Sequence, residues 1–201
     1  MKRRTLLFMG LLAIGMAVFG SAHFSSAQSD KGWITLLEGD KGLENWNRVG
    51  TANWGAVGGV VQATASDKGA GYLVSKKAYQ DFVLKIEFWV TDDANSGIFI
   101  RCADPQQISS KSCYEVNIYD QRPEPEYGTG AIVDIAKVSP MPKAGGKWNT
   151  YEITAKGTSL HVKLNDVVTA EAQDSKLAGG PFALQWGKGV VKFRNVQIKP
   201  L

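Results

Sequence analysis

The sequence has few of the residues that build metal or nucleotide sites. Its 201 residues include two cysteines and two histidines, and His161 is the only histidine after residue 27. A zinc site needs several such ligands. The sequence also lacks a glycine-rich phosphate loop between a strand and a helix, and it lacks a Gly-x-Ser-x-Gly turn. These absences exclude zinc enzymes, P-loop nucleotide hydrolases and serine hydrolases of the nucleophile-elbow type.

An excess of basic charge is also absent once the N-terminal segment is set aside. The formal net charge is +4, from 23 basic and 19 acidic residues. Lys2, Arg3 and Arg4 belong to the first 27 residues, which contain no acid, so the remainder has 20 minus 19, or +1. No lysine- or arginine-rich stripe remains to neutralise several phosphates. Nucleic acid is therefore not an expected partner.

The one continuous apolar run covers residues 6–20, after Lys2, Arg3 and Arg4 and before the small residues 25–27. This order is typical of a secretory signal peptide, and the run is too short to span a bilayer. We expect residues 1–27 to be a signal peptide and residues 28–201 to form the mature domain. The predicted location is periplasmic or secreted, with no membrane span in the mature chain.

Cys102 and Cys113 are the only cysteines. An oxidising compartment favours a disulfide between them, and closing a loop of this length stabilises a fold by roughly 3 kcal/mol. The alternative is two free thiols. By strict alternation the two residues do not share a face, so a bridge requires Cys113 to lie in the loop or at a bulge.

Helix signals are almost absent, whereas short runs of alternating apolar and polar residues recur between turn-forming residues. This pattern predicts an all-β domain, either two packed antiparallel sheets or a closed barrel. Tight hairpin turns are expected at residues 156–158 and 165–166, and a slip in the apolar alternation predicts a bulge near Arg194 and Asn195. The expected strands cover residues 34–37, 56–63, 71–75, 83–90, 97–102, 114–119, 131–135, 149–155, 159–164, 167–172, 182–186 and 190–198.

Three charged side chains project from the polar sides of consecutive expected strands. Glu87, Arg101 and Glu115 occupy these positions. If the strands are adjacent, their headgroups converge on one sheet face, where two carboxylates about 5 Å apart suit a nucleophile and acid pair and a wider gap suits water insertion. The sequence leaves both spacings open. The alternative is a solvated salt-bridge network of little energetic value.

Aromatic and amide side chains lie close in sequence to these charged residues. Asn117 and Tyr119 follow Glu115 on the same side of its strand, and Asn95 begins the strand of Arg101. Aromatic faces stack on pyranose rings, and amides hydrogen-bond sugar hydroxyls. We expect a carbohydrate ligand held by these three residues together with Gln185 on the face and Trp186 and Trp89 on the face or its rim. The remaining four tryptophans are expected to pack in the core or at strand ends.

The order of several short motifs resembles that of the 3-keto-disaccharide hydrolase family, and the resemblance runs from about residue 34 to residue 201. Individually these motifs are weak, but together they follow the family's order. They are NSGIFIR (95–101), YEVNIYD (114–120), TGAI (129–132), KWN (147–149), LN (164–165), LQ (184–185) and FRNV (193–196).

The resemblance implies a concanavalin A-like jelly roll and cleavage of glycosides that are oxidised at C3 of the sugar. A C3 ketone acidifies the C2 proton, so one carboxylate can start an elimination while an arginine stabilises the enolate. We expect Glu115 to be the base, Glu87 its partner or a sugar ligand, and Arg101 the clamp. The alternative is a non-catalytic, lectin-like domain, favoured by Trp186 and the residues after it, where the family commonly has a histidine.

No cofactor is expected. Acids and amides in the loops, such as Asp92, Asp93, Asn95 and Asp104, offer oxygen ligands for a structural calcium ion. However, no loop has the alternating acid spacing that makes such a site specific. Turn formation is the simpler explanation of these residues.

Overall fold

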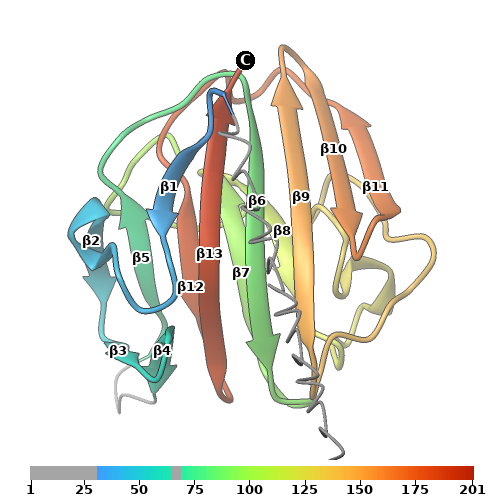
Figure 1. The fold of residues 1–201 in the computed structure, drawn as a ribbon. Coiled ribbons are helices and arrows are strands. Elements are labelled where there is room, and N and C mark those ends of the chain that lie inside the picture. The colour runs from blue at the N-terminus through green and yellow to red at the C-terminus, as the bar shows by residue number, and fades with distance from the viewer. Residues whose placement is uncertain (1–30, 65–68) are drawn as a thin grey trace, which may run out of the picture. The chain divides into compact units, whose positions relative to one another are not determined.

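The chain folds into two antiparallel sheets that form two layers (Figure 1). The computed structural model describes residues 31–64 and 69–201. Within them, the eight-stranded sheet has the order β11-β10-β9-β6-β13-β4-β3, and β1 also pairs with β13. Its strands are β1 (Ile34–Leu37), β3 (Asn53–Val57), β4 (Val60–Thr64), β6 (Phe82–Val90), β9 (Trp148–Lys156), β10 (Ser159–Leu164), β11 (Val167–Gln173) and β13 (Val191–Pro200).

The five-stranded sheet has the order β2-β5-β12-β7-β8. Its strands are β2 (Trp46–Gly50), β5 (Gly71–Ser75), β12 (Ala183–Trp186), β7 (Ser96–Ile100) and β8 (Tyr114–Ile118), and two 3₁₀ turns, η1 (Leu43–Asn45) and η2 (Pro125–Tyr127), lie in the connections. The two-sheet antiparallel sandwich predicted from the sequence is confirmed.

Alternation along the strands builds the core between the sheets. β6 alternates buried and half-buried residues along its whole length. Leu73, Ile98 and Leu184 of the five-stranded sheet and Phe88 and Tyr151 of the eight-stranded sheet belong to one buried cluster. Each sheet therefore presents one side to the core and the other outward.

The predicted turns and the bulge are present. Gly157 (φ 54°) turns β9 into β10, and Asn165 and Asp166 (φ 50° and 66°) turn β10 into β11. Positive φ at both central residues matches the right-handed twist of a hairpin. The pairing of β13 with β6 shifts between Arg194 and Gln197, and Asn195 has φ 50°.

Some strand predictions are wrong. Residues 56–63, expected as one strand, contain the β3–β4 hairpin, because Gly58 and Gly59 adopt positive φ and reverse the chain. Residues 131–135 form isolated bridges through Ile132 rather than a strand. The sequence pattern also missed β2. The export signal expected over residues 1–27 lies outside the described residues.

The connection after β6 separates two residues that were expected to meet. Residues 91–95 form a tight turn, in which the Ala94 amide donates to Thr91 O, and the chain then enters the opposite sheet at β7. Glu87 on β6 consequently lies in the eight-stranded sheet and Glu115 on β8 in the five-stranded sheet. The prediction that these acids share a face is wrong, because consecutive strands were assumed to be neighbours.

Arg101 is not on the outer face either. Its φ of 52° takes the chain out of β7, and the side chain is almost fully buried. Its guanidinium donates to Gln80 O (2.9 Å), Gly157 O (2.7 Å) and Leu177 O (3.2 Å), and it pairs with Asp81 (3.0 Å). All of these acceptors belong to the protein, so the expectation that Arg101 clamps a substrate is replaced by a structural role in tying separate segments together.

Among the described residues, no helix is both long and apolar enough to cross a membrane.

We predict that Arg101→Ala lowers the free energy of unfolding by about 3–5 kcal/mol, because it leaves the carbonyl oxygens of Gln80 and Leu177 without the guanidinium donor and removes the charged partner of Asp81, which keeps only the Gly157 amide. Urea unfolding followed by tryptophan fluorescence measures this change. The control is Arg194→Ala, which breaks a more exposed ion pair and should cost about 1 kcal/mol or less. Equal losses in the two variants would contradict the structural role of Arg101.

Candidate functional site

The outer face of the five-stranded sheet gathers several of the predicted site residues. Strand register places Glu115 opposite Phe99, and Asn117 opposite Gly97, across β7 and β8. Gln185 on β12 lies opposite Tyr72 on β5. Because β5, β12, β7 and β8 are consecutive in the sheet (Figure 1), these side chains form two adjoining rows on one face.

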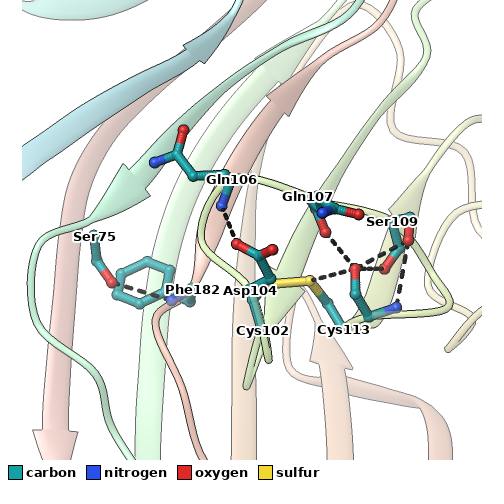
Figure 2. The surroundings of a disulfide bond; sticks show 9 residues. Ser75, Cys102, Asp104, Gln106, Gln107, Ser109, Cys113 and Phe182 are labelled. Atoms are coloured by element: carbon teal, nitrogen blue, oxygen red, sulfur yellow. Dashed lines mark hydrogen bonds between the residues drawn. A yellow bond between two sulfur atoms is a disulfide. The ribbon is translucent and has the colours of Figure 1, made fainter.

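A disulfide-closed loop covers one end of this face. Cys102 and Cys113 form a disulfide, and Figure 2 shows it with Gln107 and Ser109 of the loop beside it. The Ser112 hydroxyl donates to the Gln107 carbonyl and is hydrogen-bonded to the Ser109 hydroxyl. Beneath the loop lies a small apolar group, here called the outer cluster. It consists of Val74, Phe99, Cys102, Ile108, Cys113 and Ala183.

Next to the outer cluster, Gly97 has no side chain in the middle of the face, and we call the position that its Cβ atom would occupy the gap. A Cβ atom on Gly97 would lie 3.3 Å from Gln185 Oε1, 3.3 Å from Val116 O and 3.5 Å from Glu115 Cγ. The missing side chain therefore lets Gln185 and Glu115 pack closely against the backbone of β7 at this position. Glycine inside a strand often marks such a close approach.

Tyr72 reaches across the sheet toward this gap. Its ring packs edge-on against Phe99, with centroids 5.7 Å apart, and its hydroxyl hydrogen-bonds the Gln185 side chain. Burial raises the pKa of Tyr72, the bond to Gln185 lowers it, and the charge of Glu115 raises it. Tyr72 is thus a neutral hydroxyl within electrostatic reach of Glu115.

Glu115 has the chemistry of a proton carrier. Burial raises its pKa from 4.5 to about 7, Arg122 opposes the rise and Asp134 adds to it. Loss of water disfavours the charged carboxylate, so the protonated and ionised forms are both populated near neutral pH. A carboxyl group in this state can accept or donate a proton in a reaction.

Two amide oxygens near the gap are buried without a hydrogen-bond donor. They are Gln185 Oε1 and Asn117 Oδ1. Asn117 donates its own amide to Tyr127 O (2.7 Å), which fixes the orientation of the side chain. An unmade hydrogen bond of this kind costs about 1–3 kcal/mol. Gln185 is half-buried, whereas Asn117 is completely buried, so only the Gln185 side chain reaches the surface where a ligand could bind.

Arg122 supplies the positive charge near Glu115. Its Nε lies 3.3 Å from Glu124, whose carboxylate is exposed, but Nε makes no hydrogen bond. The guanidinium is therefore held at the rim of the face by an ion pair and keeps donors for another acceptor. The arginine whose charge acts on Glu115 is therefore Arg122 and not Arg101.

Two further predicted ligand residues, Asn95 and Tyr119, lie next to the ends of β7 and β8. Asn95 and Tyr119 are both half-buried, and they flank the same pair of strands, β7 and β8. Gly187 leaves space for Asn95, since a Cβ atom there would lie 3.4 Å from Asn95 Cγ. These two residues extend the polar face beyond Gly97.

Trp186 and Trp89 do not join the site. Trp186 faces the core on β12, where its indole donates to Gly189 O (2.8 Å), because Gln185 takes the outward position. Trp89 lies on the outer side of the eight-stranded sheet, with Lys192 4.7 Å above its ring. Glu87 is on that sheet too, bound to Arg194 (2.7 Å) and Asn195 (2.9 Å). The sequence analysis therefore merged residues from two faces.

Sequence reasoning missed Tyr72, Arg122 and Gly97. The alternation in β5 and the lone glycine in β7 were available signals for Tyr72 and Gly97. Arg122 lies in a loop, and no local pattern places it beside Glu115. In the part of the chain that the structure describes, no three His, Cys, Asp or Glu side chains group as metal ligands.

Comparison with protein families matches residues 32–199 to the family described as the 3-keto-alpha-glucoside-1,2-lyase-like domain. The chain belongs to this family. No curated protein matches the sequence. The family assignment agrees with the resemblance that the motif order indicated.

Solved structures share the fold. Two crystal structures of proteins from Parabacteroides distasonis ATCC 8503, each named a "putative glycosyl hydrolase", are similar to this chain. One has a TM-score of 0.72 and 19% identity over 85% of this chain and 94% of the other; the second has 0.68 and 25% over 84% and 99%. The carbohydrate-binding module CBM66 from Bacillus subtilis has a TM-score of 0.59 and 18% identity over 84% and 95%. The fold is a concanavalin A-like jelly roll.

We predict that Glu115→Gln stabilises the protein at pH 8 and not at pH 4. The folded pKa of Glu115 lies above the unfolded value, so the folded state binds more protons between about pH 4.5 and 7 and loses stability as the pH rises through this window. At about 1.4 kcal/mol per pKa unit, the shift from 4.5 to about 7 corresponds to a gain from the neutral amide of up to about 3–4 kcal/mol. Thermal unfolding of both proteins at the two pH values measures it. A gain of the same size at pH 4 would contradict the burial of Glu115.

Proposed function

We propose that this protein cleaves 3-keto-glycosides on the outer face of its five-stranded sheet, with Glu115 transferring the proton. The carrying observation is the gap at Gly97, which is bordered by Glu115 on one side and the unpaired Gln185 oxygen on the other. The family assignment supports a 3-keto sugar as the substrate and a 1,2-elimination as the reaction.

In the proposed step, the Glu115 carboxylate takes the proton from C2 of the sugar. The C2–H electron pair forms the C1=C2 double bond, and the C1–O bond breaks with its electrons going to the departing oxygen. That oxygen takes up a proton from the now protonated Glu115. The products are an alcohol and an unsaturated 3-keto sugar, so atoms and charge balance without water or an external oxidant.

The residues around Glu115 have separate tasks in this step. Arg122 stabilises the negative charge that develops on the C3 oxygen when C2 loses its proton. Gln185 accepts a hydrogen bond from a sugar hydroxyl, and Tyr72 holds the Gln185 amide in place. A pKa near 7 suits Glu115 to accept and then return one proton.

We also propose that the protein works in the periplasm or outside the cell. The sequence of the first 27 residues and the disulfide between Cys102 and Cys113 support an oxidising location. Detection of mature protein beginning near residue 28 in a periplasmic extract would test this.

Glu115→Gln should reduce turnover of a 3-keto-disaccharide by at least about a hundredfold, because the amide cannot take the C2 proton. In the unmodified enzyme, kcat/KM should rise with pH through an apparent pKa of about 7, as the carboxylate form grows. Product release is followed by chromatography beside the unoxidised parent sugar. Glu152→Gln, a change on the eight-stranded sheet, is the matched control. Full activity of Glu115→Gln would overturn the assignment.

Gly97→Ala should lower kcat/KM by roughly ten- to hundredfold, because its methyl group enters the gap between Gln185 and Glu115. Gly55→Ala is the matched control, since a Cβ atom on Gly55 meets nothing within 4 Å. Both variants should keep their far-ultraviolet circular dichroism. Equal kinetics for the two variants would show that the gap is not used.

A second candidate function is carbohydrate binding without turnover. The unpaired amide oxygen of Gln185 favours it, because this atom would hold an unreactive sugar equally well. CBM66 and the VIP36 lumenal domain in its Ca²⁺/Man-bound form, which share the fold, are named for such binding. Binding of a 3-keto-disaccharide measured by calorimetry, with no product released, would select this function.

A further inference from the structure

A polar cavity lies on the outer side of the eight-stranded sheet, in the other layer from Glu115. Two strand irregularities lie at its position: the pairing of β1 with β13 shifts between Thr35 and Leu37, and that of β13 with β6 shifts between Arg194 and Gln197. Bulges re-aim side chains and bend strands, and they are frequent beside functional sites. Here they accompany a cavity of about 320 Å³.

The cavity is lined by hydrogen-bonding side chains. Thr35, Glu38, Glu87, Asn195 and Gln197 border it, with Leu37 as the apolar member. A second cavity of about 200 Å³ adjoins it, because Thr35 and Glu38 line both. The two hollows together make a polar depression beside β1, which we call the β1 groove.

Several of the groove's polar groups are already fixed in place. Glu87 accepts from Arg194 Nε (2.7 Å) and from Asn195 Nδ2 (2.9 Å), so one carboxylate is oriented by two donors. Gln197 Nε2 donates to the Thr35 hydroxyl (3.3 Å). Glu38 lies in a turn closed by two backbone bonds with Lys41, both 3.1 Å. Groups that are held before binding lose little entropy when a ligand arrives.

The chemistry of the lining selects the type of ligand. The 320 Å³ cavity has two carboxylates and no lysine or arginine in its lining, and the adjoining cavity adds Glu44 and Lys41. The groove therefore has three carboxylates against one ammonium group and disfavours anions. The one leucine of the 320 Å³ cavity gives little area for an apolar molecule. Carboxylate oxygens that already accept one bond retain lone pairs for further donors, and amide and hydroxyl groups offer both donors and acceptors. A neutral ligand with several hydroxyl groups matches this set.

We infer that the β1 groove binds a neutral oligosaccharide, at a site separate from the one around Glu115. The presence of two adjoining hollows, which share Thr35 and Glu38, favours a chain of sugars over a single ring. Glu87, which the sequence pattern grouped with Glu115, belongs to this second site. The inference does not require that the five-stranded sheet perform catalysis.

The experiment is an NMR titration of the ¹⁵N-labelled mature protein with a panel of neutral probes: maltotriose, cellotriose and laminaritriose. At least one probe should cause saturable shifts of the backbone amides of Glu38, Asn195 and Gln197. Asn195→Gly keeps the left-handed backbone conformation but removes the amide group, so it should weaken this binding about tenfold. Gln185→Ala, on the other sheet, should leave the affinity measured at these amides unchanged.

Several outcomes would overturn the inference. They are the absence of saturable shifts with every probe, equal affinity in the Asn195→Gly protein, or shifts caused by calcium chloride alone, which would assign the carboxylates to a cation. Loss of 3-keto-glycoside cleavage in Glu115→Gln with unchanged groove shifts would separate the two sites. Absence of any turnover in the unmodified protein, with the groove shifts present, would refute the proposed function and keep this inference.

Discussion

The apolar contact between the two sheets is the interaction on which every other feature depends. Each strand that contributes a residue such as Leu73, Ile98 or Leu184 to the core must turn its next residue away from it. Burial of apolar area stabilises by about 25 cal/mol per Å², so this alternation is strongly enforced. The outward positions are then free to carry Tyr72, Gln185, Gly97 and Glu115 on a rigid surface.

The polar face is not simply a solvated surface, because it has its own apolar support. The outer cluster and the disulfide-closed loop shield one end, and Tyr72 packs on Phe99 within reach of Glu115. This partial exclusion of water raises the pKa of Glu115 and leaves amide oxygens unpaired. Both effects reduce the stability of the fold. Destabilising groups that occur together at one place are typical of a functional site, where reactivity or binding is favoured over stability.

Sequence reasoning correctly predicted those features that are controlled by local residue patterns. The alternation fixed the strand faces, so Glu115, Asn117 and Gln185 were correctly placed outward, and the turns at Gly157 and Asn165 followed from their residues. The pattern does not encode which strands are neighbours. Residues 91–95 carry the chain to the other sheet, and this one connection separates Glu87 from Glu115. Arg101 was misplaced for a related reason, since its positive φ ends the alternation.

The loop between Cys102 and Cys113 also has a practical consequence for anyone who makes this protein. The disulfide holds this loop against Phe99 and Ala183, and a disulfide forms only where thiols are oxidised. Material produced in a reducing bacterial cytosol would keep its two sheets but lack this restraint beside Glu115. A negative assay on such a preparation would describe the thiol form alone, so recombinant samples should be routed through the periplasm or refolded with a glutathione couple before any substrate is judged inert.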